Sequence, residues 1–171
     1  MPLELTILHA VQSLFVDSSW AKMFVVICAR WLIFALPVCA LLAWRFKHLR
    51  RHALVEITWS VLFAAVMAFA GEFIIARPRP FTVDTTIDVL IPRPHTMSFP
   101  SAHASIAYAL ALALFGWNRP LGIVALLAAD LIAIGRVASG VHYPTDVLAG
   151  LLVGVLAFTI VRLGHRWIRT K

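Results

Sequence analysis

An arginine, a histidine and an aspartate lie close together near the C-terminal end of the sequence, between two strongly apolar stretches. They are Arg136, His142 and Asp146, and charged groups in such surroundings are costly unless they have a function. His142 and Asp146 are four residues apart, so on a helix they would share a face. The carboxylate could then fix the imidazole tautomer and stabilise the cation that forms when the histidine attacks an electrophile. This spacing predicts a nucleophilic histidine supported by an aspartate.

Two earlier polar stretches supply groups that would complete a phosphoryl-transfer site. The first, Arg77-Pro78-Arg79-Pro80, offers guanidinium forks, which bind phosphate oxygens in bidentate fashion. The second, 98–103, contains a predicted helix start, where free N–H groups favour an anion, and a histidine that could protonate a leaving oxygen. We therefore expect one composite site for an anion with several negative oxygens. Its candidate residues are Arg77, Arg79, Arg93, Arg136, Ser101, His103, His142 and Asp146.

The composition of the chain places this site in a membrane protein. Of the 171 residues, 61% are hydrophobic and 13% are charged, whereas soluble domains average about 25% charged residues. The net charge of +7 would suit nucleic acid, but no soluble basic domain is present to bind it. We expect no nucleic-acid partner, because Lys and Arg in cytoplasmic loops account for the charge.

The elements that must position the polar residues are predicted to be the helices of a single all-α, polytopic membrane bundle, residues 1–171. An amphipathic helix lying in the membrane interface is expected within 1–19, because apolar residues recur at helical spacing through 3–16. A transmembrane catalytic bundle is expected over 20–171. It contains five apolar stretches long enough, or nearly long enough, to span a membrane. They are 23–44, 55–76, 101–117, 121–135 and 146–163.

Nine of the fifteen Lys and Arg residues fall on one side of this five-span arrangement. They lie in 45–52, at Arg119 and in 162–171, and the positive-inside rule makes that side cytoplasmic. The same count places 77–100, 136–145 and the N-terminal helix together on the opposite side. The three polar stretches are therefore expected to share one face of the membrane.

In these three stretches the chain resembles the type 2 phosphatidic acid phosphatase superfamily. The motifs of that superfamily are Lys, six residues, Arg-Pro; then Pro-Ser-Gly-His; then Ser-Arg, five residues, His, three residues, Asp. This sequence has Glu72, six residues and Arg79-Pro80; then Pro100-Ser101-Ala102-His103; then Gly135-Arg136, His142 and Asp146 at the same spacing. With the spans between the motifs, the resemblance covers about 55–163.

The resemblance implies a role for each matching residue. His142 would become phosphohistidine, Asp146 would be its partner, and His103 would be the general acid. The residues implied to bind the substrate phosphate are Arg79, Ser101 and Arg136, with Ala102, Arg77 and Glu72 in or beside the same motifs. The superfamily works without a metal or another cofactor, so none is expected here.

Three positions depart from the superfamily pattern. Gly135 stands in place of Ser, and Ala102 in place of Gly; alanine suits a helix start but not a backbone position with positive φ. Glu72 in place of Lys removes one cation from the phosphate site and could instead form a structural ion pair with Arg79. A glutamate here, with the size of the chain and its five spans, is similar to the bacterial undecaprenyl pyrophosphate phosphatase branch. That likeness implies a polyprenyl diphosphate substrate, a bacterial inner-membrane location, and an active site facing the periplasm or the cell exterior.

Several other functions fit the same residues. A phosphatase for phosphatidic acid or phosphatidylglycerol phosphate, or a lipid A phosphotransferase, would use the same chemistry. A small transporter of anionic lipids would need polar groups spread through the membrane thickness, whereas here they concentrate at one face. A zinc site formed by His95, His103, His142 and Asp146 lacks any tight ligand spacing. Arg77 and Arg93 could simply contact lipid headgroups. The sequence predicts no oligomeric state.

Overall fold

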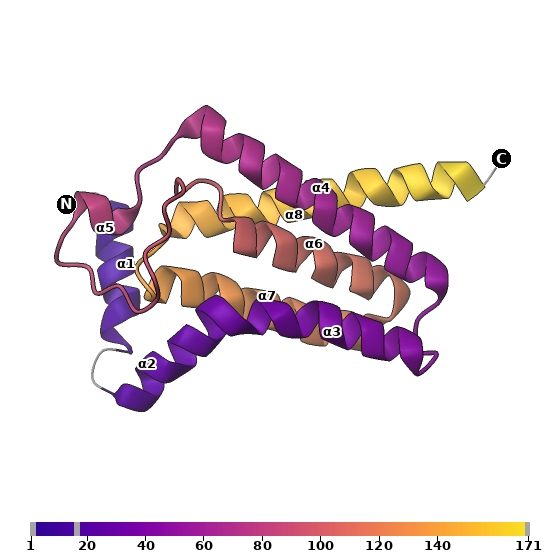
Figure 1. Ribbon diagram of the computed structural model, residues 1–171, viewed down its shortest axis with the longest axis horizontal. Helices are drawn as coiled ribbons and strands as arrows, with labels where there is room; N and C mark the ends of the chain where they lie inside the picture. Colours follow the sequence, from indigo (N-terminus) through magenta and orange to yellow (C-terminus); the bar gives the residue numbers. More distant parts are fainter. Residues whose placement is uncertain (1–2, 16–17, 170–171) are drawn as a thin grey trace.

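The computed structural model describes residues 3–15 and 18–169, and every regular element within them is a helix (Figure 1). The ends of the predicted elements at 1–2, 16–17 and 170–171 lie outside the described residues. The elements are α1 (Leu3–Ser13), α2 (Ser19–Val26), a π-helical segment (Ile27–Trp31), α3 (Leu32–Arg45), α4 (Arg51–Ile75), α5 (Pro80–Val83), α6 (Ala102–Trp117), α7 (Arg119–Ala138) and α8 (Pro144–Arg169).

Five of the predicted stretches form helices apolar enough to belong in a membrane. Four are also long enough to cross it by length and composition, and a shorter apolar helix, α6, is the fifth. The four long ones are Ser19–Arg45, Arg51–Val83, Arg119–Ala138 and Pro144–Trp167. The prediction of an all-α polytopic bundle with about five transmembrane helices is confirmed.

Helix α6 lies at the centre of the bundle, packed against α4, α7 and α8. Five of its six alanines are completely buried, and such small side chains allow neighbouring helices to approach closely. They are Ala104, Ala107, Ala109, Ala111 and Ala113. Because other helices enclose it, α6 can be shorter, at 16 residues, than the helices around it.

The polar stretches lie together at one end of the bundle. The long helices run along a common axis, and α1, α5, the loop after α5 and the turn between α7 and α8 gather at the same end (Figure 1). The turn between α3 and α4, the turn between α6 and α7, and the C-terminal end of α8 lie at the other end. The loops therefore segregate in space as the span count predicts.

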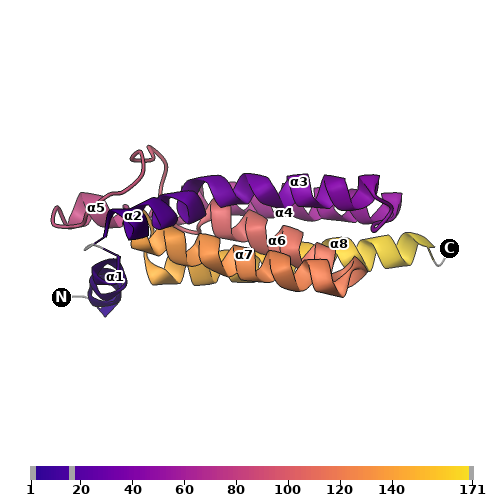
Figure 2. The same cartoon turned by 90° about the horizontal axis from the view of Figure 1, so that it is seen from below.

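Helix α1 crosses the bundle instead of running along it (Figure 2). This is the orientation expected of a helix in the plane of a membrane interface. However, Leu5 and Leu8 are buried in the main hydrophobic core. The Gln12 amide also donates hydrogen bonds to the backbone oxygens of Asp88, at 2.7 Å, and Ala138, at 3.1 Å. Helix α1 is thus fixed to the loop and to the end of α7.

Candidate active site

The polar stretches enclose a cavity of about 540 Å³ at the end of the bundle where α1 lies. Its charged and polar lining residues are Arg30, Glu72, Arg79, Arg93, Thr96, His103, Arg136 and His142. Ala102 and several apolar side chains complete the wall. Four guanidinium groups and two imidazoles around one cavity form an environment suited to a phosphorylated ligand.

His142 reaches this cavity from the turn between α7 and α8. Gly140 in the turn has φ +74°, and a Cβ at this position would lie 2.6 Å from Cγ2 of Ile87. Glycine is therefore required to lead the chain from α7 to His142. Helix α8 begins two residues after His142, so only Asp146 of the pair is helical. The two residues meet across a turn and do not share the helical face that the sequence predicts.

The hydrogen bonds of the His142 ring identify the nitrogen that carries its lone pair. Nδ1 lies 2.8 Å from the backbone oxygen of Ser98 and 3.5 Å from Oδ2 of Asp146. A carbonyl oxygen only accepts, so Nδ1 carries the proton and Nε2 carries the lone pair. Nε2 lies 3.3 Å from Nη1 of Arg79 and 3.3 Å from Nη2 of Arg136. The lone pair is therefore positioned between two groups that can bind the oxygens of the phosphate it would attack.

Burial keeps this imidazole neutral. Burial is the largest cause that lowers the pKa of His142, the charges of Arg136 and Arg79 lower it further, and the hydrogen bond to Asp146 opposes the shift. A neutral imidazole has the free electron pair that a nucleophile needs. The site thus favours the neutral form of His142.

Asp146 is fully buried in the first turn of α8 and is held from several directions. Its carboxylate accepts hydrogen bonds from the backbone N–H of Tyr143, at 2.8 Å, from Nη1 of Arg77, at 2.8 Å, and from the hydroxyl of Ser98. These contacts satisfy its charge and fix its place beside Nδ1 of His142.

Arg79 is fixed in the wall of the cavity by hydrogen bonds to backbone oxygens. Its guanidinium donates to Thr96, Met97 and Val141, each at 2.8 Å, and also to the Thr96 hydroxyl at 2.9 Å. Only 4% of Arg79 is exposed. Such fixed donors need little rearrangement when a phosphate arrives.

Arg136 and Ser101 retain buried polar groups without a partner. Nη1 of Arg136 donates to the backbone oxygen of Ala29 at 3.1 Å, but its Nε has no hydrogen-bond partner among residues 3–15 and 18–169. The same holds for the hydroxyl of Ser101, the residue that precedes α6. Buried groups left unpaired in this way are unusual and indicate a ligand site.

Ala102 and His103 form the first turn of α6 and line the cavity. Among the described non-glycine residues, positive φ occurs only at Lys47 and Ala76. Ala102 thus lies in ordinary helical backbone, and replacing the superfamily glycine with alanine causes no strain. His103 lies in the same cavity as Nε2 of His142, where a proton donor to the leaving group would be needed.

Glu72 and Arg77 have different surroundings. Glu72 lines the cavity, where the charge of Arg79 acts on its carboxylate. Arg77 is not among the lining residues. It contacts Asp146 and Glu4, and its guanidinium carbon lies 3.9 Å from the centroid of the Tyr143 ring.

Two residues at the site were not predicted from the sequence. Arg30 lines the cavity, although it lies in a predicted span; the only signal was a charge within an apolar stretch. The hydroxyl of Ser98 contacts Asp146, and no sequence pattern marked it for this role. Among the described residues, no group of three or more His, Cys, Asp or Glu could hold a metal ion.

An apolar cavity of about 510 Å³ adjoins the polar one, and Ala102 and His103 line both. Its remaining walls come from α3, α4 and α6, and include Phe34, Leu62 and Ile106. A hydrocarbon chain in this cavity would lead directly to His103.

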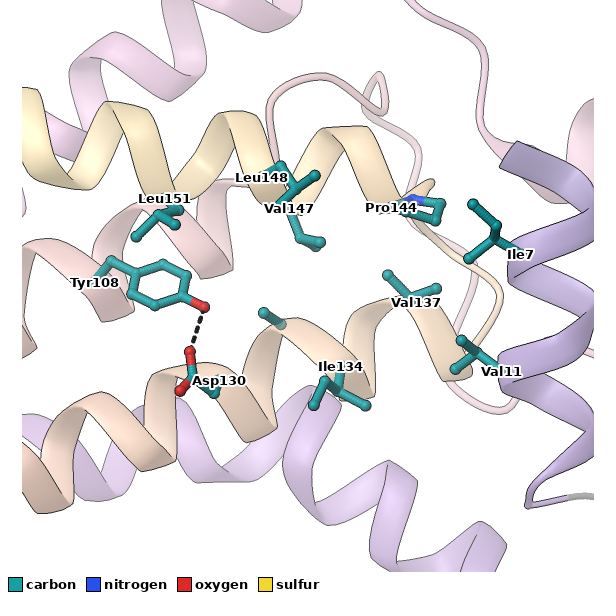
Figure 3. A pocket seen from close by; sticks show the side chains of 11 residues that line it. Ile7, Val11, Tyr108, Asp130, Ile134, Val137, Pro144, Val147, Leu148 and Leu151 are labelled. Carbon is teal, nitrogen blue, oxygen red and sulfur yellow. Dashed lines mark hydrogen bonds between the residues drawn. The ribbon is translucent and has the colours of Figure 1, made fainter. Parts of the chain in front are cut away.

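A third cavity, of about 450 Å³, lies between α1, α7 and α8 (Figure 3). Its wall is apolar except around one pair, in which the Tyr108 hydroxyl donates to Oδ1 of Asp130 at 2.7 Å. None of the arginines or histidines of the polar cavity lines it. Phosphate chemistry is therefore assigned to the polar cavity.

Residues 53–169 match the PAP2 superfamily, and this segment carries all three motifs. The chain belongs to the PAP2 superfamily. The resemblance seen in the sequence is thus confirmed, and the cavity around His142 lies where the PAP2 motifs converge.

Curated PAP2 relatives act on lipid-linked phosphates according to their names. The chain is 30% identical to undecaprenyl-diphosphatase BcrC of Bacillus subtilis over 159 residues, covering 88% of this chain and 78% of that protein. It is 37% identical to an undecaprenyl-diphosphatase of Sulfolobus acidocaldarius over 123 residues, covering 70% of this chain and 57% of that protein. It is 33% identical to decaprenylphosphoryl-5-phosphoribose phosphatase of Mycobacterium tuberculosis over 165 residues, covering 92% of this chain and 88% of that protein.

Solved structures share the PAP2 fold. Aquifex aeolicus LpxE has a TM-score of 0.76 at 22% identity, covering 94% of this chain and 95% of that one. A PAP2 type phosphatidylglycerolphosphate phosphatase from Bacillus subtilis has a TM-score of 0.69 at 22% identity, covering 98% of this chain and 89% of that one. At this identity the likeness establishes the helical fold and leaves the substrate to the residues of the site.

Proposed function

We propose that this PAP2 protein hydrolyses undecaprenyl diphosphate, or another polyprenyl diphosphate, to the monophosphate and inorganic phosphate through a phosphohistidine at His142. The observation that carries the proposal is the place of Nε2 of His142, 3.3 Å from one guanidinium nitrogen of Arg79 and from one of Arg136. The relatives named undecaprenyl-diphosphatase support the substrate class.

The first step forms a bond between Nε2 of His142 and the terminal phosphorus as the bond to the bridging oxygen breaks. Arg79, Arg136 and Ser101 bind the oxygens on which charge is spread in the transition state. His103 donates a proton to the bridging oxygen, which leaves on the polyprenyl monophosphate. The backbone oxygen of Ser98 and the carboxylate of Asp146, both near Nδ1, stabilise the positive charge of the phosphorylated ring.

The second step returns His142 to its starting form. A water molecule attacks the phosphohistidine, and His103, deprotonated by the first step, takes a proton from it. The bond between Nε2 and phosphorus breaks, and inorganic phosphate leaves. Both steps use groups of the chain itself, so we expect turnover in the presence of EDTA.

The adjoining apolar cavity is the proposed place for the lipid tail. Its walls on α3 and α4 would accept a hydrocarbon chain entering from the membrane, and Ala102 and His103 would place the headgroup in the polar cavity. The positive-inside rule then orients the site toward the periplasm or the exterior of a bacterial inner membrane. There the enzyme would support recycling of the lipid carrier for peptidoglycan synthesis and resistance to bacitracin.

A second candidate substrate is a polyprenyl-linked sugar phosphate. The relative named decaprenylphosphoryl-5-phosphoribose phosphatase covers nearly the whole chain, and its substrate would be a phosphate ester on a lipid-linked sugar. The same attack by His142 would cleave that ester. Glycerophospholipid phosphatases and lipid phosphotransferases would use the same chemistry. Assays with different substrates distinguish these activities from hydrolysis of a polyprenyl-linked phosphate.

The decisive assay measures phosphate release by detergent-purified protein in EDTA. Substrates are undecaprenyl diphosphate, decaprenylphosphoryl-5-phosphoribose, phosphatidic acid and phosphatidylglycerol phosphate in parallel, with His142→Ala as the control. Preference for the diphosphate, lost in His142→Ala, is the expected result. Preference for another lipid would overturn the proposed substrate and keep the proposed chemistry. If none releases phosphate, the phosphotransferase and lipid-transporter functions become the leading candidates.

A further inference from the structure

The polar cavity holds more positive charge than the transferred phosphate requires. A terminal phosphate carries about two negative charges, which the two buried guanidinium groups at Nε2 of His142, those of Arg79 and Arg136, can balance. Two further arginines, Arg30 and Arg93, line the same cavity and are exposed to it. Four guanidinium charges against the one carboxylate, that of Glu72, leave a formal +3. A diphosphate bonded to one lipid carries up to about three negative charges.

Neither of these two arginines has a structural role of its own. Among residues 3–15 and 18–169, neither side chain takes part in a hydrogen bond or an ion pair. Each instead lies near an aromatic ring: the guanidinium carbon of Arg30 is 5.1 Å from the ring centroid of Trp31, and that of Arg93 is 5.5 Å from that of Phe81. Contact with an aromatic ring orients a guanidinium group and leaves its N–H donors available.

The backbone around Arg30 is tied to the phosphate site. Arg30 lies in the π-helical segment Ile27–Trp31, and π-helical turns are often found at functional sites. The preceding residue, Ala29, accepts a hydrogen bond from Nη1 of Arg136 at 3.1 Å. The position of Arg30 is therefore fixed relative to a group beside the nucleophile.

Gly135 makes this close packing possible. A Cβ at this position would lie 2.8 Å from the backbone nitrogen of Ala29, so a larger residue would push the π-helical segment away from α7. Serine, which the superfamily pattern has here, would not fit without a shift. Two departures from the pattern thus compensate each other: Glu72 removes a cation from the cavity, and Gly135 allows Arg30 to supply one.

We propose that Arg30 and Arg93 form a second anion subsite, which binds the phosphate group that is not transferred and so favours lipids with two phosphates over phosphomonoesters. This inference rests on the proposed phosphatase function and adds the determinant of its substrate preference. Contact with the phosphates of ordinary membrane lipids is the competing explanation, and it predicts no such preference.

The kinetic test compares Arg30→Gln, Arg93→Gln and the double variant with Arg50→Gln. Arg50 is an exposed arginine that directly precedes α4, in the turn between α3 and α4, and this turn lies at the far end of the bundle (Figure 1). We expect kcat/KM for undecaprenyl diphosphate to fall about 10- to 100-fold in the double variant, as for loss of charge-assisted hydrogen bonds. For phosphatidic acid it should change less than about threefold, and Arg50→Gln should match the wild type on both lipids. Equal losses on both lipids, or no loss on the diphosphate, would overturn the subsite.

A binding measurement keeps this result separate from the proposed function. In His142→Ala protein, which cannot turn over, calorimetry should find inorganic pyrophosphate binding at least about tenfold more tightly than inorganic phosphate. The advantage should disappear when Arg30→Gln and Arg93→Gln are added. Equal affinity for the two anions in His142→Ala refutes the subsite whichever lipid the wild type hydrolyses. If pyrophosphate is preferred but no diphosphate lipid is hydrolysed, the subsite stands and the proposed substrate fails.

Discussion

Nη1 of Arg77 lies 2.8 Å from Oδ1 of Asp146, whose other oxygen, Oδ2, lies 3.5 Å from Nδ1 of His142. Arg77 also pairs with Glu4 of α1. The sequence predicts Arg77 to be a phosphate ligand, but its side chain contacts Asp146 and Glu4 and does not line the cavity. Its guanidinium would therefore act on catalysis through Asp146.

Replacing Arg77 with alanine is expected to lower kcat more than it raises KM. The change leaves the buried carboxylate of Asp146 without its cationic partner, and a shift of that carboxylate would misplace His142. We expect kcat to fall about 10- to 100-fold, with partial recovery in Arg77→Lys. A large rise in KM at unchanged kcat would instead show that Arg77 binds substrate directly.

Helix α1 is expected to contribute to the stability of the bundle. Leu8 is completely buried in the main core, so Leu8→Ala would leave a cavity and lower the free energy of unfolding by about 2–4 kcal/mol. The matched control is Leu14→Ala, because Leu14 is 76% exposed and its loss should change stability by less than about 0.5 kcal/mol. Thermal unfolding in detergent measures both. Equal effects would mean that α1 contacts lipid more than protein.

Acidification is expected to destabilise the protein through His142. Burial is the main cause that lowers the pKa of His142 from its ordinary 6.5 to about 4, so between these values the unfolded chain binds a proton that the folded protein does not. The stability due to the neutral ring is complete above pH 6.5 and is lost as the pH falls toward 4. We expect the free energy of unfolding to fall by about 1–3 kcal/mol over this pH range.

The check is thermal unfolding from pH 7.5 to 4.5 in wild type and His142→Gln. His103, which lines the same cavity, is present in both proteins, so the difference between the two curves isolates His142. The wild type should lose more stability than the variant across this range. Parallel curves would show that His142 does not keep its proton-free state in the fold.

The helices and the motifs could be predicted from the sequence. Features that depend on contacts between residues far apart in the chain could not. The predicted span 121–135 ended before the charge of Arg136, yet α7 continues to Ala138, and Nη1 of Arg136 donates to the backbone oxygen of Ala29. Hydropathy marks where charge begins, whereas α7 ends just before Gly140, whose positive φ leads the chain out of the helix.

The two arginines beside prolines, Arg77 and Arg79, illustrate the same limit. Both lie in one motif, but Arg79 enters the cavity and Arg77 turns to Asp146 and Glu4. Those partners are 69 and 73 residues away in the chain. Spacing within a motif cannot encode a contact of that kind, which only the packed fold provides.

Ser101 offers the clearest separation of stability from function. Its hydroxyl is buried and has no partner among the described residues, so Ser101→Ala removes an unsatisfied polar group and should leave the unfolding temperature unchanged or raise it. If the hydroxyl binds phosphate, the same change should lower kcat/KM about 10- to 100-fold.

Vanadate supplies the independent readout, because its trigonal-bipyramidal form mimics the phosphoryl transition state. At a concentration of about 100 times its Kd, vanadate should stabilise the wild type by about 2.7 kcal/mol. Ser101→Ala should gain clearly less at the same concentration, because it binds vanadate more weakly. Full activity together with full stabilisation by vanadate in Ser101→Ala would mean that the unpaired hydroxyl does not contact the phosphate, and would leave Arg79 and Arg136 as its principal ligands.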